Sequence, residues 1–399
     1  MSSKTLVAVQ TYNSPENLAE VLSSLDNIEH EFSILILDDS SRDSFKEKNE
    51  FIASNCRYET HYVNDETFDK YVDRLVTESK NLERPNILEK ITIGRDEWDI
   101  PSGRRARQLL CHAAFSNDNY LFLDGDYRAT PDTDLSPEFD EPLIGMQVKG
   151  SFDLSRVQWI FVCNRLAELE SSDTKFTRLR SKIEKAYKSD YIENIIDDLT
   201  PEEIRTCIGR YTDLLPAENS NIRITFPNEN YLSGGAFACS SEAVGIGYFP
   251  DWYGEDGVWF SDVVNELNIG RPKTDTSFFH NPGKKKILDR ESIERETVGM
   301  FLLVAAIEYN QQGEIGRSRL EKLRRTRIER LQEEKDCAAR LDGFAGNLDE
   351  AIEWAILHLE SMNLEAIETR LHQYKRDQYD WTTTISKIKQ GGVKLDENR

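Results

Sequence analysis

The sequence predicts an α/β fold in which a mostly parallel sheet is flanked by helices. Residues 5–9 and 33–37 read TLVAV and SILIL, near-continuous apolar runs of the kind found in strands buried on both faces. Between them, Ser14 and Pro15 are well suited to begin a helix, because serine is a favoured N-cap and proline a favoured first helical residue. Apolar residues then recur at helical spacing at Leu18, Val21, Leu22 and Leu25. Strand, helix and strand in this order are typical of a parallel sheet covered on both faces.

A third buried strand, residues 120–123, stops at Asp124-Gly125-Asp126. Ligands in open α/β sheets bind where strands end. Two carboxylates separated by one glycine are costly to hold together unless a positive group neutralises them. A divalent cation bound to a diphosphate would do so, because hard cations bind carboxylate and phosphate oxygens together. An ordinary acidic turn is the alternative interpretation, since Asp-Gly is common in turns.

A helix is predicted just before this strand, within residues 101–115. Ser102 and Gly103 supply a cap, and a narrow apolar stripe follows at Ala106, Leu109, Leu110, Ala113 and Ala114. Its first turn carries Arg104, Arg105 and Arg107, where the helix dipole disfavours cations. The cluster indicates either an anionic neighbour or three solvated arginines.

Three later segments of the sequence are further candidates for a binding or catalytic site. The glycines Gly234 and Gly235 let the backbone approach a ligand closely. Glu255 and Asp256 stand among aromatic residues, which indicates a sugar platform with a general base or a packed aromatic core with surface acids. The aromatic residues concerned are Trp252, Tyr253, Trp259 and Phe260. His280 ends a short apolar segment, and this lone histidine is either a structural side chain or a ligand that follows the acidic clusters in order.

Six motifs follow one another in an informative order: VQTYNSP at 9–15, LDDSS at 37–41, GRRARQ at 103–108, LFLDGD at 121–126, SGGAFA at 233–238 and GEDGVWF at 254–260. Over residues 4–285 the chain resembles a glycosyltransferase of the GT-A fold, most similar to the family 2 group. The segment 151–228 has no counterpart in this resemblance, and Gln108 stands where many relatives carry asparagine.

The resemblance implies roles for individual residues. Thr11, Tyr12 and Asp39 would hold the base and ribose of a nucleotide sugar, with a UDP-sugar favoured, and Arg107 would also lie on the donor. Asp124 and Asp126 would form the DXD motif and, with His280, the metal site: Asp126 would lie directly on Mn²⁺ or Mg²⁺, Asp124 nearer the sugar-nucleotide, and His280 would complete the site. Gly234 and Gly235 would line the donor-sugar pocket. Asp256 would be the base of an inverting transfer to a hydroxyl acceptor, and Glu255 would orient a substrate.

Other activities are open to the same residue types. A retaining GT-A enzyme would have a similar layout. A sugar nucleotidyltransferase would normally carry a glycine-rich, basic phosphate loop after the first strand, and residues 10–15 contain neither glycine nor a basic residue. A non-catalytic GT-A-like binding protein would be expected to have lost the acids, which are all present.

The domain organisation predicted is a catalytic domain over 1–285 and a helical region over 286–399. Residues 151–228 are charged and helix-biased and form a candidate acceptor-side insert within the first domain. Helices are predicted over 319–340 and 348–371. Such a region packs on the catalytic domain or on a twin subunit, so a homo-oligomer through these helices is one expectation.

Bulk composition excludes some partners. Lys and Arg number 50 against 72 Asp and Glu, a net charge of −22, which argues against a non-specific nucleic-acid or anionic-membrane surface. The longest apolar run, residues 300–307, is far too short to span a membrane. The six cysteines are scattered without a CxxC pair, and the first strand begins too early to leave room for a signal peptide. A soluble cytoplasmic protein is the expectation.

Overall fold

The computed structural model describes residues 5–26, 28, 31–78, 87–88, 119–131, 133, 142–150, 191–192, 235–268, 273–280, 285–286, 289–338 and 346–391. The strands are β1 (Thr5–Thr11), β2 (Phe32–Asp38), β3 (Thr60–Asn64), β4 (Asn119–Asp124), β5 (Tyr127–Ala129), β6 (Leu143–Gly150), β7 (Tyr191–Ile192), β8 (Ala236–Ser240), β9 (Lys273–His280) and β10 (Lys285–Lys286). The α-helices are α1 (Pro15–Leu25), α2 (Asp43–Ser54), α3 (Asp65–Glu78), α9 (Glu255–Leu267), α10 (Arg290–Gln312), α11 (Arg317–Ala338), α12 (Gly346–Ser361) and α13 (Leu364–Gly391). A short 3₁₀ helix, η2, spans Ala243–Gly245.

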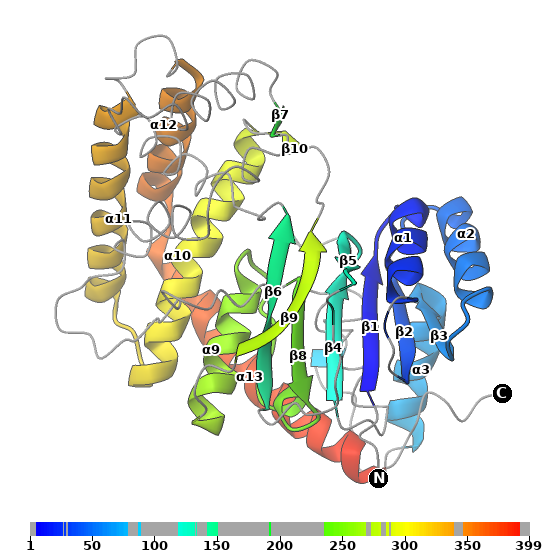
Figure 1. The fold of residues 1–399 in the computed structure, drawn as a ribbon. Coiled ribbons are helices and arrows are strands. Elements are labelled where there is room, and N and C mark those ends of the chain that lie inside the picture. Colours follow the sequence, from blue (N-terminus) through cyan, green and yellow to red (C-terminus); the bar gives the residue numbers. More distant parts are fainter. Residues whose placement is uncertain are drawn as a thin grey trace.

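Eight strands form one sheet in the order β3-β2-β1-β4-β8-β6-β9-β5 (Figure 1). Strands β3, β2, β1 and β4 are parallel neighbours, and β6 is parallel to β9. Strands β8 and β5 run in the opposite direction, since each pairs antiparallel with its neighbours. The mostly parallel sheet predicted from the sequence is confirmed.

Helices cover both faces of this sheet. Successive side chains of a strand point to opposite faces, so they belong to two different cores. On β1, Leu6 and Ala8 belong to the core that includes α3, α9 and α10–α13. Val7 and Val9 belong to the other core, which α1 closes with its buried leucines and valine. The predicted start of α1 at Ser14 and Pro15 is also confirmed, although Ser14 makes no side-chain capping hydrogen bond.

The C-terminal helices pack on one another, on α9 and on η2, and their apolar side chains share one core with a face of the sheet (Figure 1). The predicted helix over 348–371 is interrupted, since α12 ends at Ser361 and α13 begins at Leu364. The reason lies at Asn363, whose side-chain Oδ1 accepts a hydrogen bond from the backbone N of Glu365 at 3.0 Å. This cap starts a new helix at a point where the apolar spacing alone suggests continuity.

Helix α13 ties the C-terminal region to the segment around α9. Arg370 donates to the carbonyl oxygen of Asp251 at 2.8 Å, and its guanidinium lies 5.6 Å from the ring centre of Trp252. Further along α13, Tyr374 and Gln378 both donate to the carboxylate of Asp262 on α9. The side chains that α13 buries or half-buries include a series spaced alternately by three and four residues: Leu364, Ile367, Leu371, Tyr374, Gln378, Trp381, Ile385 and Ile388.

The Asp262 carboxylate is a buried acid that makes the stability of the fold depend on pH. Burial raises its pKa from 3.8 to about 6, against hydrogen bonds from Tyr374 and Asn310 that lower it. Because the pKa of Asp262 is higher in the folded protein than in the unfolded one, the folded protein binds more protons at pH values between 3.8 and about 6. The stability that this group contributes is therefore present below pH 4 and is lost as the pH rises through 6.

Asp262→Asn should remove this dependence. We expect the free energy of unfolding of the variant, relative to that of the wild type, to rise by about 2 kcal/mol between pH 4 and pH 7. Urea unfolding at a series of pH values measures the difference. Glu314→Gln, which changes an exposed carboxylate between α10 and α11, is the control and should show no such trend. A constant difference for Asp262→Asn across this range would contradict the account.

None of the helices within the described ranges has a stretch long and apolar enough to cross a bilayer. Within those ranges Cys56 and Cys239 are free thiols. Burial raises the pKa of the Cys239 thiol far above its usual value, so this side chain acts as a small apolar residue in the core.

Candidate functional site

The predicted ligand-binding residues gather at one edge of the sheet because of the directions in which their strands run. Strand β1 lies between β2 and β4 and pairs parallel with both, with Thr11 opposite Asp38 and Gln10 opposite Asp124. The carboxyl ends of the three strands therefore lie side by side. Strand β8 is antiparallel to β4, so Gly235, which precedes it, returns to this edge, and its carbonyl oxygen accepts a hydrogen bond from the backbone N of Asp124 at 2.8 Å.

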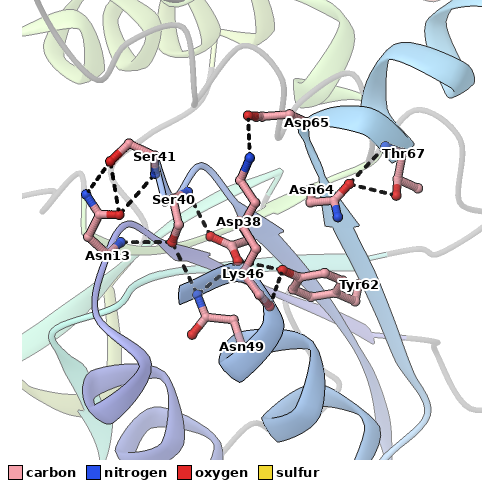
Figure 2. Close-up of polar contacts among 10 residues, drawn as sticks. All are labelled: Asn13, Asp38, Ser40, Ser41, Lys46, Asn49, Tyr62, Asn64, Asp65 and Thr67. Carbon is pink, nitrogen blue, oxygen red and sulfur yellow. Dashed lines mark hydrogen bonds and ion pairs between the residues drawn. The ribbon is translucent and has the colours of Figure 1, made fainter. Parts of the chain in front are cut away.

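The loops that follow β1 and β2 are fastened to each other (Figure 2). Asn13, in the left-handed conformation at φ 52°, donates its backbone N–H to Ser40 Oγ at 2.9 Å. Its side-chain Oδ1 accepts from the backbone N of Ser41 at 3.0 Å, and its Nδ2 donates to Ser41 Oγ at the same distance. These bonds fix the positions of Tyr12 and Asp39, the neighbours of the bonded residues.

The carboxylate of Asp38 supports the loop after β2 through hydrogen bonds (Figure 2). It is fully buried and accepts from the backbone N of Ser40 at 2.8 Å, from Asn49 Nδ2 at 2.9 Å and from the Tyr62 hydroxyl at 2.5 Å. Burial, followed by this bond to Asp38, raises the pKa of Tyr62 well above its usual range, so the hydroxyl remains a donor. The sequence motif contains both Asp38 and Asp39, and only the structure assigns the supporting role to Asp38.

Thr11, Tyr12 and Asp39, the residues predicted to hold the nucleotide, lie together. The backbone N of Asp39 donates to the carbonyl oxygen of Thr11 at 3.1 Å. The Thr11 hydroxyl oxygen is buried and has no hydrogen-bond partner among the described residues. Tyr12 leaves 45% of its surface exposed beside it. A buried hydroxyl without a partner next to an exposed aromatic ring is suited to receive a polar, planar ligand.

The Asp124-Gly125-Asp126 turn is packed tightly on the neighbouring strand. A Cβ added at Gly125 would lie 3.0 Å from the carbonyl oxygen of Gln10 on β1. A side chain at this position would therefore require the turn or this carbonyl to move by a few tenths of an ångström. The closeness of the two backbones favours glycine between the acids, in addition to any role in binding.

Asp126 and His280 are brought together from segments more than 150 residues apart in the sequence. His280 ends β9 and pairs with Tyr127 on β5, and its Nε2 lies 3.3 Å from Asp126 Oδ2. Its ring stacks on that of Tyr127 with centres 4.4 Å apart, and it is almost fully buried. On the other side, Gly235 makes room for Tyr127, since a Cβ there would lie 2.3 Å from the ring. Stacking thus orients the imidazole towards the carboxylate.

A carboxylate and an imidazole are ligand types that Mn²⁺ accepts, and Mg²⁺ accepts the carboxylate. Within the described residues, no three His, Cys, Asp or Glu side chains are grouped closely enough to hold a metal ion by themselves. This pattern fits an ion bound by one or two protein groups together with substrate phosphates, the usual arrangement for Mg²⁺. The donor set therefore fits a metal that arrives with a diphosphate.

Glu255 and Asp256 come from a different element, the first turn of α9. Asp256 Oδ1 accepts a hydrogen bond from the backbone N of Gly257 at 2.8 Å, and both acids are half-buried. A carboxylate at the N-terminus of a helix is stabilised in its charged form by the helix dipole.

The aromatic residues around these acids belong to the core. Trp259 is fully buried and stacks on Phe249 with ring centres 5.2 Å apart. Trp252 is buried against Tyr374 of α13. The interpretation as a packed aromatic core with acids nearer the surface therefore holds for both tryptophans, and they do not form a sugar platform. Four features named from the sequence, Arg107, Gly234, the helix within 101–115 and all of the insert except β7, lie outside the described residues.

No protein-family model matches the chain. No curated protein matches it either. Among solved structures, it is similar to glucosyl-3-phosphoglycerate synthase from Mycobacterium tuberculosis, in a complex with Mn²⁺, UDP and glucosyl-3-phosphoglycerate. The two chains are 14% identical, the overlap covers 79% of this chain and 81% of that chain, and the TM-score is 0.37. Mannosyl-3-phosphoglycerate synthase from Rubrobacter xylanophilus overlaps with 13% identity, 79% and 76% coverage and a TM-score of 0.38. S. aureus TarS in complex with UDP overlaps with 16% identity, 97% and 92% coverage and a TM-score of 0.38. Overlap at this level does not establish a shared activity.

Proposed function

We propose that this protein is a metal-dependent glycosyltransferase that moves a sugar from a UDP-sugar to a hydroxyl acceptor with inversion. The observation that carries the proposal is the pairing of Asp126 with His280 at 3.3 Å, on the sheet edge where Asp124, Thr11 and Asp39 also lie. The Asp126–His280 pair lies at one part of this edge, and the buried Thr11 hydroxyl, which has no hydrogen-bond partner among the described residues, lies at another. This arrangement fits a nucleoside diphosphate that lies across the edge.

In the proposed site, Asp126, Asp124 and His280 would hold Mn²⁺ or Mg²⁺, and Asp124 would also face the sugar-nucleotide. The bound ion supplies stabilisation of the negative charge on the leaving diphosphate. The Thr11 hydroxyl and the Asp39 carboxylate bind ribose and base, and the Tyr12 ring covers the base. Arg107, Gly234 and Gly235 complete the donor side.

Asp256 is the proposed base. As the acceptor hydroxyl attacks the anomeric carbon, its proton passes to the Asp256 carboxylate, the bond from the sugar to the diphosphate breaks, and the nucleoside diphosphate leaves. Glu255, one residue earlier in the same helical turn, orients the acceptor or the sugar. The position of both at the start of α9 supports this role, because this segment is anchored to the C-terminal helices: Arg370 of α13 donates to the carbonyl oxygen of Asp251, and Gly257 lies close to Leu303 of α10.

A donor screen tests the proposal. UDP-, GDP- and other nucleotide sugars are incubated with the protein with Mn²⁺, with Mg²⁺ and with chelator, and release of the nucleoside diphosphate is measured. We expect UDP-sugars to be turned over with metal and to be stable in chelator. A protein that neither binds nor turns over any nucleotide sugar would contradict the proposal.

Two properties extend the proposal. We place the protein in the cytoplasm, for which the free thiols Cys56 and Cys239 are the support. We also keep the expectation of a homo-oligomer through the C-terminal helices, for which sedimentation of the purified protein is the measurement.

A further inference from the structure

Arg128 lies in the middle of β5, two residues after Asp126, and only 13% of its side chain is exposed. Its Nη1 donates to the carbonyl oxygen of Gly125 at 2.8 Å and to that of Tyr127 at 3.0 Å. These carbonyls belong to the residues immediately before and after Asp126. One guanidinium thus fastens the backbone on both sides of the aspartate that is paired with His280.

The other edge of the same guanidinium is attached to α1. Arg128 Nη2 lies 3.0 Å and Nε 3.3 Å from Glu20 Oε2. One turn further along α1, Ser24 Oγ accepts a hydrogen bond from the backbone N of Ala129 at 2.9 Å. Strand β5 is therefore held to α1 at two points, and the acid turn is fixed relative to a helix packed on the sheet.

Arginine is suited to this arrangement in a way that lysine is not. Its planar group presents five donors in a fixed fork, so it can bind two carbonyls and a carboxylate at once. The ion pair with Glu20 contributes little by itself, because 66% of the Glu20 side chain is exposed. The two carbonyl bonds are half-buried and restrict the turn directly.

We propose that Arg128 is a positioning residue for the metal site: it fixes the backbone around Asp126 and so aims the Asp126 carboxylate at His280 and at the ion. This inference rests on the proposed function, because it needs the metal site of the glycosyltransferase. It concerns a residue that the sequence motif does not include.

The test measures Mn²⁺ binding in the presence of UDP, by the electron paramagnetic resonance signal of free Mn²⁺, in Arg128→Gln and Arg128→Lys. Removal of a group that orients a metal ligand is expected to weaken Mn²⁺ binding by about 10- to 100-fold. Arg57→Gln is the matched control: Arg57 forms an ion pair with Asp26, the residue just after α1, at 2.6 Å, and its hydrogen bonds go to Asp26 and Tyr58 and to no residue of the acid turn. Thermal unfolding of each variant separates a loss of fold from a loss of binding.

The outcomes distinguish a failure of the proposed function from a failure of the proposed role of Arg128. A wild-type protein that does not bind Mn²⁺ with UDP would contradict the proposed function itself. Wild-type binding together with unweakened binding in both Arg128 variants would overturn the role of Arg128. Full Mn²⁺ affinity in Arg128→Lys, with weakened affinity in Arg128→Gln, would also overturn the role of Arg128. The positive charge, rather than the hydrogen bonds of the guanidinium to two carbonyls, would then support Mn²⁺ binding. If Arg128→Gln does not fold, the comparison of Arg128→Lys with Arg57→Gln decides.

Discussion

Asp126→Ala should lower metal-dependent turnover of the donor by about 100-fold or more, because metal stabilisation of a leaving group is worth several kcal/mol. The substitution removes the carboxylate that lies 3.3 Å from His280 Nε2 and leaves the stacking of His280 on Tyr127 in place. Release of the nucleoside diphosphate from a UDP-sugar, measured over a range of Mn²⁺ concentrations, checks the result.

Glu47→Ala is a suitable control for Asp126→Ala, because Glu47 is an exposed carboxylate on α2, away from the acid turn. It should leave turnover and thermal stability unchanged. Turnover in Asp126→Ala equal to that of the wild type, or full wild-type activity in chelator, would remove the metal from the mechanism.

Asp256→Asn should slow sugar transfer by about 100-fold or more, the usual cost of a lost general base. Asparagine keeps the shape of the side chain and its amide oxygen can still accept the hydrogen bond from Gly257, so the first turn of α9 should be preserved. Donor binding and Mn²⁺ binding should be unchanged, since neither depends on the base. The measurement is the rate of transfer, in wild type and variant, to a hydroxyl acceptor found with the wild-type protein.

Glu255→Gln is the neighbouring comparison and should be less damaging if Glu255 only orients a substrate. A collapse of donor affinity in Asp256→Asn would place this residue on the donor or the metal. Near-normal transfer would indicate a retaining mechanism or another base, and the stereochemistry of the product, read by NMR, would separate these cases.

Local patterns in the sequence were sufficient for the strands and the acid turn. The apolar runs that end at Asp38 and Asp124 lie in β2 and β4 as predicted, because strands buried on both faces leave a clear signal. The Ser14-Pro15 start of α1 is equally local. The shared edge then follows from the parallel directions of β1, β2 and β4.

The parts that the sequence did not reveal depend on contacts between distant residues. Arg128 meets Glu20 across 108 positions, and nothing near either residue signals this contact. Asp38 and Asp39 are adjacent and chemically identical, so only the burial of Asp38 beneath Asn49 and Tyr62 tells them apart. The tryptophans near Asp256 were ambiguous for the same reason, since the partner of Trp252 is Tyr374 on α13.

The attachment of α13 to the segment around α9 has a consequence for synthesis of the chain. Arg370 reaches Asp251 across 119 residues, and Gln378 reaches Asp262 across 116. At ordinary rates of translation, α13 is made about 6 to 24 s after its partners. During that interval the nascent chain presents Trp252 without Tyr374 and Tyr248 without Trp381. The turn that carries Asp256 therefore gains its final support only after the ribosome has passed the whole of α10, α11 and α12.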